Sequence, residues 1–159
     1  MAAGKWKAYE YAKEYFADGT FDMDNAALGL TAALFLSTSN ANTLSVGTGV
    51  YGDLTNEVAN AFGYTTGGQA LTGEVWTHSG GTVTFDADNV IWTASGGSIT
   101  ARFGVIYCNA TVNTIVKPLL CVCLLESVGP ADVTATTGNT LTIAMNASGI
   151  LTLSGADSD

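Results

Sequence analysis

The chain has 159 residues and a formal net charge of −9, and 47% of its residues are hydrophobic while only 12% are charged. This length fits one domain, and the apolar fraction is sufficient for a core. A typical soluble domain is about one quarter charged, so the charged fraction is low, and Thr, Ser, Gly and Asn take the place of Lys and Glu. The composition favours strands and turns and excludes an extensive basic surface.

Basic residues are too few for nucleic-acid binding. Lys5, Lys7 and Lys13 lie near the start of the sequence, and only Arg102 and Lys117 follow them. A nucleic-acid binder needs a basic stripe that displaces counterions from phosphates, and nothing after residue 13 could form one. The sequence therefore predicts no nucleic-acid partner.

The sequence also predicts no membrane partner. Its first residues lack the apolar stretch of a signal peptide, and the longest apolar run, Pro118 to Leu125, is far too short to span a bilayer. We therefore expect synthesis and folding in the cytoplasm.

Residues 5–17 are predicted to form a helix that ends at Asp18-Gly19. Ala, Lys and Glu favour the helical state, apolar residues repeat at helical spacing, and Gly can adopt the left-handed conformation that follows a helix. A helix this short cannot bury five aromatic rings against itself, so it either caps one end of a β core or docks on a neighbouring subunit. The candidate docking residues are Trp6, Tyr9, Tyr11, Tyr15 and Phe16.

From Phe21 onward the sequence is typical of strands. Leu28 to Leu36 predicts a buried strand, and Asp53 predicts the N-cap of one or two helical turns. Further strands, separated by Gly- and Asn-rich turns, are predicted over residues 69–77, 81–86, 89–94, 98–108, 116–126, 139–145 and 149–153. This spacing indicates a mainly β fold, an antiparallel β-sandwich or jelly-roll-like barrel with a short N-terminal helix. We therefore divide the chain into a helical segment, residues 1–20, and a β domain, residues 21–159.

The three cysteines are predicted to be buried thiols. Cys108, Cys121 and Cys123 are odd in number, which argues against a purely intramolecular disulfide framework. Metal binding by the Cys-x-Cys pair is the alternative, but no cluster of His or Cys accompanies it. Small buried hydrophobes in a reducing cell are the favoured interpretation. The surrounding run from Lys117 to Leu125 is apolar at consecutive positions, which predicts a central strand, with Pro118 at an edge or bulge.

The pattern Phe-Asp-x-Asp-Asn occurs twice, at residues 21–25 and 85–89. Carboxylates with an Asn can bind Ca²⁺, but both copies lack the Gly and the later Glu of an EF-hand loop. Asp and Asn also form turns by bonding to their own backbone. We predict turns at both places, and neither a metal ion nor a cofactor in the protein.

No residue pattern indicates an enzyme. His78 is the only histidine, it lies beside a predicted turn, and no nucleophile elbow accompanies it. Trp76 and Trp92 could stack on sugars, although their positions within predicted strands favour core packing. The sequence therefore predicts a protein without a catalytic function.

Several segments resemble a family of small tailed-bacteriophage virion structural proteins. The resemblance runs in order over nearly the whole chain, and the family pattern also opens with a short helix and a Gly-x-Phe-Asp-x-Asp-like start of the first strand. The segments that carry it are Gly19-Thr-Phe-Asp-Met-Asp, Asp53-Leu-Thr-Asn-Glu-Val, Gly63-Tyr-Thr-Thr-Gly-Gly, Val83-Thr-Phe-Asp-Ala-Asp-Asn-Val-Ile-Trp-Thr-Ala, Ile99-Thr-Ala-Arg-Phe-Gly-Val-Ile-Tyr and Gly149-Ile-Leu-Thr-Leu. These motifs belong to the fold and carry no catalytic groups.

The resemblance implies a component of the virion, and we expect a capsid decoration (cement) protein on the capsid exterior. Its partners would be the major capsid protein and copies of itself, with many modest contacts repeated by symmetry. One alternative is a tail or head–tail connector component that forms a ring through edge-strand pairing. A second alternative is a module displayed on the particle that binds a host-surface glycan or receptor.

Overall fold

The computed structural model describes residues 4–23, 28–126 and 131–154, and its strands pair in antiparallel sheets. The largest sheet has five strands in the order β1-β11-β8-β2-β3, so β8 is central and β1 and β3 are the outer strands. The bounds are Lys7–Ala8 for β1, Leu119–Leu124 for β11, Phe103–Cys108 for β8, Leu30–Phe35 for β2 and Gln69–Ala70 for β3.

Smaller sheets extend the fold. One has three strands in the order β14-β5-β4, and the others are the pairs β13-β6, β12-β7 and β10-β9. Their bounds are Val75–Ser79 (β4), Thr82–Asp86 (β5), Val90–Thr93 (β6), Ile99–Ala101 (β7), Thr111–Val112 (β9), Ile115–Val116 (β10), Val133–Ala135 (β12), Thr140–Ile143 (β13) and Leu151–Ser154 (β14). The described residues also form the α-helix α1, Glu10–Ala17, and the 3₁₀ turn η2, Tyr51–Asp53.

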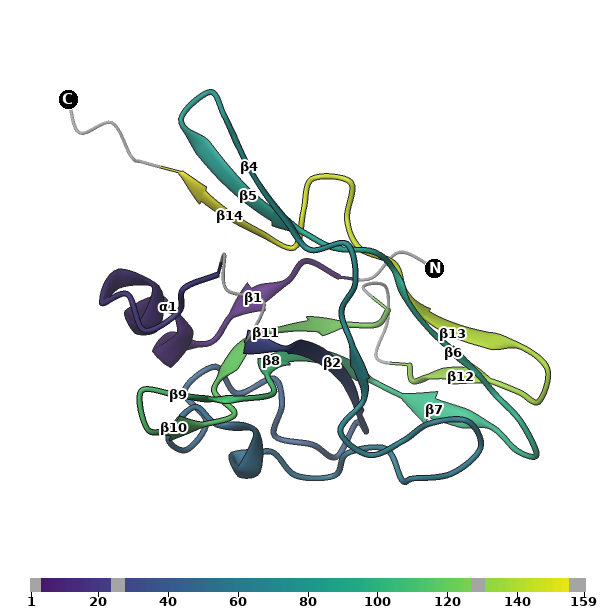
Figure 1. Ribbon diagram of the computed structural model, residues 1–159. Coiled ribbons are helices and arrows are strands. Elements are labelled where there is room, and N and C mark those ends of the chain that lie inside the picture. The colour runs from purple at the N-terminus through teal and green to yellow at the C-terminus, as the bar shows by residue number, and fades with distance from the viewer. Residues whose placement is uncertain (1–3, 24–27, 127–130, 155–159) are drawn as a thin grey trace.

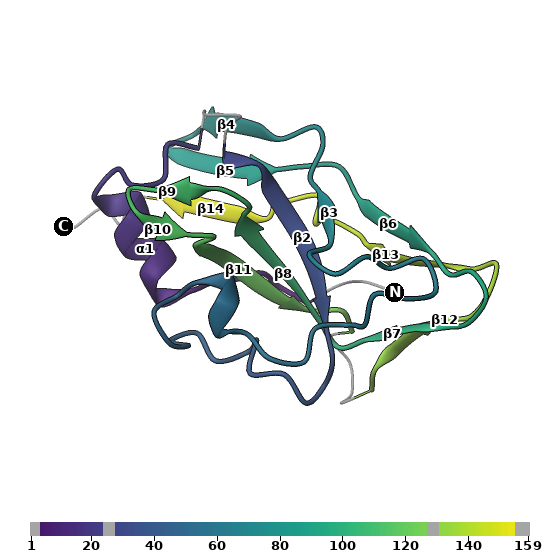
Figure 2. The same ribbon diagram turned by 60° about the horizontal axis from the view of Figure 1, so that its bottom comes forward.

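The large sheet lies between two covering layers (Figures 1 and 2). In Figure 1 the three-stranded sheet lies above it, the β6–β13 pair lies to its right, and the loop of residues 36–68, which includes η2, lies below it. Every residue of β2 and β8 is buried, because both faces of these strands are covered. This burial explains why, apart from Thr31, their consecutive positions are apolar instead of alternating with polar ones.

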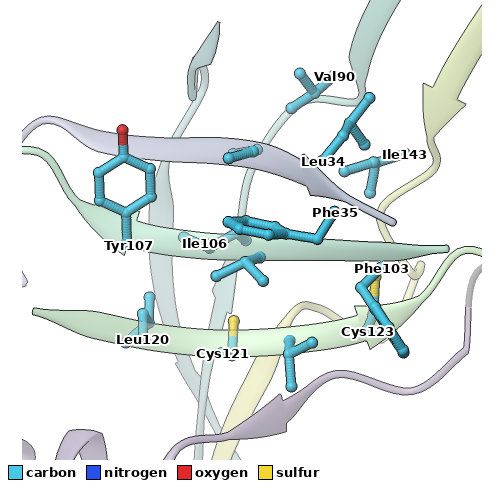
Figure 3. Packing of buried hydrophobic residues seen from close by; sticks show 14 of the residues in the cluster. Leu34, Phe35, Val90, Phe103, Ile106, Tyr107, Leu120, Cys121, Cys123 and Ile143 are labelled. Carbon is cyan, nitrogen blue, oxygen red and sulfur yellow. The ribbon is translucent and has the colours of Figure 1, made fainter. Parts of the chain in front are cut away.

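Figure 3 shows the side chains that fill the core. Leu34 of β2 lies beside Ile143 of β13. Gly104 of β8 is paired with Leu34, and a Cβ at Gly104 would stand 2.8 Å from Ile143 Cδ1. The missing side chain therefore lets the β6–β13 pair approach the large sheet closely. On the opposite face, the ring of Tyr107 stacks on that of Tyr51 in η2, with ring centroids 4.3 Å apart.

The predicted fold class is confirmed. The structure is mainly β, its sheets are antiparallel and its α-helix is short. The layers are sandwich-like, and the described strands close no barrel. The prediction for residues 117–125 is also confirmed, because β11 is buried in the large sheet and its register shifts between Leu119 and Cys121, directly after Pro118.

Two predicted strands are each divided in the structure. Residues 98–108 form β7 and β8, which belong to different sheets, and Arg102 lies at the crossing, where its N–H donates to the Phe35 carbonyl oxygen at 2.8 Å. Residues 69–77 form β3 and β4, again in different sheets. Sequence reasoning does not predict β9, β10 or β12, because strands of two or three residues are too short to show an alternating pattern.

The helical turn predicted to begin at Asp53 is wrong in position, because η2 ends at this residue. The Asp53 carboxylate accepts hydrogen bonds from the N–H groups of Thr48, at 2.7 Å, and Val50, at 3.2 Å. These donors precede Asp53, so the side chain stabilises the turn before it and not a helix after it. Farther along the loop, Glu57 forms an antiparallel bridge with Phe35 of β2.

The cysteines are free and buried, as predicted. Cys108 Sγ donates a hydrogen bond to the Leu28 carbonyl oxygen at 2.9 Å. Desolvation by burial raises the pKa of each thiol above its usual value, to about 12 for Cys123.

We expect the native protein to resist thiol labelling at neutral pH. The thiolate is the reactive form, and burial both suppresses ionisation and keeps the reagent away from sulfur. A maleimide should therefore modify the cysteines only after denaturant is added, as measured by the mass of the intact protein. Labelling of the native protein at a rate similar to that in denaturant would contradict their burial.

Candidate binding groove

The N-terminal segment begins as a strand, so the helix predicted over residues 5–17 is wrong in its first part. Lys7 pairs with Val122, which makes β1 the outer strand of the large sheet, and the Tyr9 N–H donates to the Leu120 carbonyl oxygen at 3.1 Å. These backbone groups form hydrogen bonds with the edge of β11. The free energy of this pairing outweighs the helix propensity of residues 5–8. α1 begins at Glu10, the residue after the last of these hydrogen bonds, and it ends at Asp18 and Gly19 as predicted. Part of the predicted helical segment therefore belongs to the large sheet.

Two of the five candidate docking residues, Tyr9 and Tyr15, are buried inside the protein. The Tyr9 hydroxyl donates to the Ala41 carbonyl oxygen at 2.6 Å, which joins the segment to the loop of residues 36–68. The Tyr15 ring lies edge-on to that of Phe21, with centroids 5.4 Å apart. These two side chains cannot reach a neighbouring subunit without leaving the core. They therefore fit the alternative interpretation, in which α1 caps one end of the β core.

The other candidates, Trp6, Tyr11 and Phe16, are partly exposed. Tyr11 packs closely on the lower loop, because a Cβ at Gly49 would stand 2.6 Å from Tyr11 Cδ2. The Phe16 ring lies 6.5 Å from that of Trp76 on β4. α1 thus links the lower loop to the three-stranded sheet above. A docking role for the exposed parts of Trp6, Tyr11 and Phe16 stays a prediction.

A groove lies between the N-terminal segment and β14, and we call it the edge groove. Its first cavity, of about 500 Å³, is lined by Lys5, Trp6, Asn146 and residues 148–152. Its second, of about 210 Å³, is lined by Lys13, Phe16, Trp76 and residues 151–153. Both cavities contact Ala8 of β1 and also share Leu151 and Thr152, so they are neighbours along β14, and we treat them together as the edge groove. Figure 1 shows β1 and β14 on its two sides.

The two strands that line the edge groove are outer strands of different sheets. β1 pairs only with β11, and β14 pairs only with β5, among the residues that the structure describes. Each strand therefore keeps one edge whose N–H and C=O groups have no strand partner. Such edges are available for pairing with another polypeptide.

An apolar row of side chains crosses the three-stranded sheet beside the groove. Leu151 is paired with Phe85 and Phe85 with Trp76, so these side chains project from the same face. The Trp76 and Phe85 rings stack with centroids 4.8 Å apart. The next row on this face, two residues farther along each strand, includes Leu153, which is 49% exposed. The groove is thus apolar along the sheet and opens to solvent at its β14 end.

Hydrogen-bond donors predominate among the polar groups of the edge groove. Lys5 and Lys13 supply one ammonium group to each cavity, and neither is paired with a carboxylate among the described residues. The indole N–H groups of Trp6 and Trp76 are buried without a hydrogen-bond acceptor in the described part of the chain. Because these two nitrogens are not exposed to solvent, the exposed ammonium groups of Lys5 and Lys13 are the charged donors that a ligand in the groove can reach.

The tryptophans considered for sugar binding have different environments. Trp92 is 2% exposed and lies in the core, as the core-packing interpretation predicts. Trp76 is partly exposed beside the edge groove. Trp76 and Trp92 therefore do not form one stacking surface in the described structure.

In the second Phe-Asp-x-Asp-Asn segment, residues 87–89 connect β5 to β6, and one side-chain hydrogen bond is local to this connection while another reaches a distant part of the chain. Asp86 accepts the Ala87 N–H at 2.9 Å, and Asn89 accepts the Met145 N–H at 2.8 Å. The first copy extends beyond the described residues. Within the described ranges no group of three or more His, Cys, Asp or Glu side chains is placed to hold a metal ion, and His78 is exposed on β4. No helix in this part of the chain is long and apolar enough to cross a bilayer.

Sequence reasoning missed a polar cluster around Glu57, in the loop of residues 36–68. The Glu57 carboxylate accepts hydrogen bonds from the Tyr64 hydroxyl at 2.6 Å, the Gly67 N–H at 2.6 Å and the Tyr51 hydroxyl. The Tyr64 hydroxyl in turn accepts the Leu34 N–H at 3.0 Å, which ties the loop to β2. The cluster therefore holds the lower layer against the large sheet.

Tyr107 of β8 completes this cluster from the sheet. Its hydroxyl donates to the Gly67 carbonyl oxygen at 2.8 Å, and Lys117 Nζ lies 5.5 Å from the Tyr51 ring centroid and 6.0 Å from that of Tyr107. An ammonium at this distance is attracted to the faces of both rings. The residues come from separate parts of the chain, so no local spacing in the sequence signals the cluster.

Alkaline pH is expected to unfold the protein cooperatively. Desolvation by burial, the largest cause, raises the pKa of Tyr9, Tyr51 and Tyr64, and raises that of Tyr107 to about 12. In the unfolded chain these phenols ionise near pH 10, so the stability that they contribute is complete below about pH 10 and is lost as the pH rises toward and above 12. Tyrosinate absorbance and circular dichroism should therefore change together. Ionisation of most tyrosines in a protein with native circular dichroism would contradict this.

The geometry brings together two open strand edges with aromatic side chains and ammonium groups beside them. No family model, no curated protein and no solved structure matches this chain.

Proposed function

We propose that the chain is a structural component of a tailed-bacteriophage particle, a capsid decoration protein on the outside of the shell with no catalytic function. The observation that carries the proposal is the edge groove, where β1 and β14 have open edges in a protein with few charged residues. Open edges bind other polypeptides through backbone hydrogen bonds. The resemblance of the sequence to virion structural proteins supports the major capsid protein as that partner.

The outer face of the three-stranded sheet supports close packing in an assembly. This face carries rows of small hydroxyl side chains beside Val75 and Asp86, so most of the surface that a neighbouring subunit would meet there is small and uncharged. The rows are Thr77, Thr84 and Thr152, followed by Ser79, Thr82 and Ser154. Modest contacts of this kind become strong when the symmetry of a particle repeats them.

The proposal is tested with capsids assembled in the absence of this protein. Purified protein should co-sediment with expanded, undecorated capsids, saturate at a fixed number of copies per particle, and raise the temperature at which the particles open. Bovine serum albumin at the same concentration is the control for trapping in the pellet. Absence of co-sedimentation, with heat resistance unchanged, would reject a decoration role.

The open edges on two sheets also favour a second candidate, a tail or head–tail connector component. An edge on β1 and an edge on β14 could pair with different neighbours and so generate a closed ring. Size-exclusion chromatography with light scattering separates the candidates, because a discrete ring of many copies favours the connector. A glycan- or receptor-binding module receives less support, since Trp92 is in the core.

A further inference from the structure

We infer that the edge groove binds an extended, acidic peptide segment of another protein, which adds a strand to the open edge of β14. The inference deepens the proposed function and rests on it only for the source of the segment, another protein of the same particle. The binding chemistry is argued from the groove itself.

The length of the groove suits a short strand. It follows the chain from residue 146 to Leu153, alongside the four residues of β14. A strand advances about 3.3 Å per residue, so a segment of roughly four to six residues could lie along this edge. Backbone N–H and C=O groups of the segment would pair with those of β14 that have no strand partner.

Alternate side chains of the incoming strand would project into the apolar part of the groove. There they would pack beside Leu151, Trp76 and Phe16, which line the second cavity. They would also cover Leu153, which is 49% exposed. Because successive side chains of a strand point to opposite faces, apolar residues are needed only at every second position of the segment.

The charges of the groove select an acidic segment. Among the described residues, Lys5 and Lys13 line the groove and no Asp or Glu does. Carboxylates and backbone carbonyls of the ligand are the complementary acceptors. A second copy of the chain is a less suitable partner, because its net charge of −9 would be brought against an equal charge.

The probe is a display library of random peptides of about nine residues, selected on the full-length protein. We expect the selected peptides to be enriched in Asp and Glu, with β-branched residues at alternate positions. A synthetic copy of a selected peptide should change the tryptophan fluorescence of the protein, since two tryptophans line the groove. Enrichment of basic peptides, or of none, would overturn the inference.

Charge-reversal variants locate the binding site. Lys5→Glu combined with Lys13→Glu should weaken binding of the selected peptide at least about tenfold at low salt. Lys7→Glu is the matched control, because Lys7 lies on the same segment but lines neither cavity, and a single reversal there should change affinity much less. Thermal unfolding of each variant checks that it is folded. Lys5→Glu and Lys13→Glu are also made as single variants. If Lys7→Glu lowers the affinity for the peptide as much as either of them does, the peptide binds elsewhere.

Two further outcomes separate this inference from the proposed function. Peptide binding that persists in a protein that fails to bind capsids would reject the decoration role and keep the groove assignment. Capsid binding that is unaffected by Lys5→Glu and Lys13→Glu would reject the groove as the attachment site. A dimer in sedimentation equilibrium that the same reversals dissociate would show that a second copy, and not another protein, occupies the groove.

Discussion

Replacement of Gly68 by alanine is expected to lower the free energy of unfolding by about 3 kcal/mol, from the sum of backbone strain and overpacking. Gly68 has a φ of +79°, and a Cβ there would stand 1.9 Å from the Ala32 carbonyl oxygen and 2.8 Å from Ala33 Cα. Both neighbours are backbone atoms of β2, which is paired on both sides within the large sheet. β2 cannot move away from position 68 without losing its pairing with β8 or β3. Urea denaturation followed by circular dichroism measures the effect.

Gly96→Ala is the matched control for this prediction. Gly96 has a φ of +72°, close to that of Gly68, but a Cβ there would meet no atom within 4 Å. The substitution should therefore carry only the strain of the left-handed conformation, about 1 kcal/mol. Equal losses in the two variants would show that conformation alone, and not the approach to β2, sets the requirement for glycine at position 68.

Glu57→Ala is the second substitution with a large expected effect. It removes the carboxylate that accepts hydrogen bonds from Tyr51, Tyr64 and the Gly67 N–H. Each partly buried donor left without an acceptor costs about 1–3 kcal/mol, and water entering beside the loop would recover some of this, so we expect a total loss of about 3 kcal/mol. The same denaturation experiment measures it.

Glu57→Gln distinguishes hydrogen bonding from loss of side-chain volume. The amide keeps one oxygen for Tyr64 and the Gly67 N–H, and its nitrogen can donate to the Tyr51 hydroxyl, so the loss should be only about 1 kcal/mol. Limited proteolysis adds a local measurement, because the loop of residues 36–68 should become the first cleavage site in Glu57→Ala. Unchanged stability in both variants would mean that the cluster does not hold the loop.

The mainly β fold could be predicted because each main strand carries its own local signal. Leu141 and Ile143 alternate with threonines on β13, and the structure buries both of them. The consecutive apolar residues of β11 likewise predict its burial on both faces. Patterns of this kind depend only on residues that are close in the sequence, so they can be recognised without knowledge of the tertiary contacts.

The edge groove could not be predicted, because its parts have no local signal. Residues 5–8 include good helix formers, yet Lys7 and Ala8 form a strand because they pair with the edge of β11. The opposite side comes from residues 146–153, at the other end of the described chain. Tyr9 and Tyr15 were candidates for docking because five aromatic residues occur close together, and only the packing shows that these two are buried.

The pairing of β1 with β11 also determines when the edge groove can form during synthesis. The two strands are separated by most of the chain, so β1 can pair only after β11 has been synthesised and has emerged from the ribosome. The groove needs β14 as well, which comes later still. A nascent chain therefore lacks the complete edge groove until β14 has been synthesised, so a peptide of the kind inferred above would find its site only at that stage.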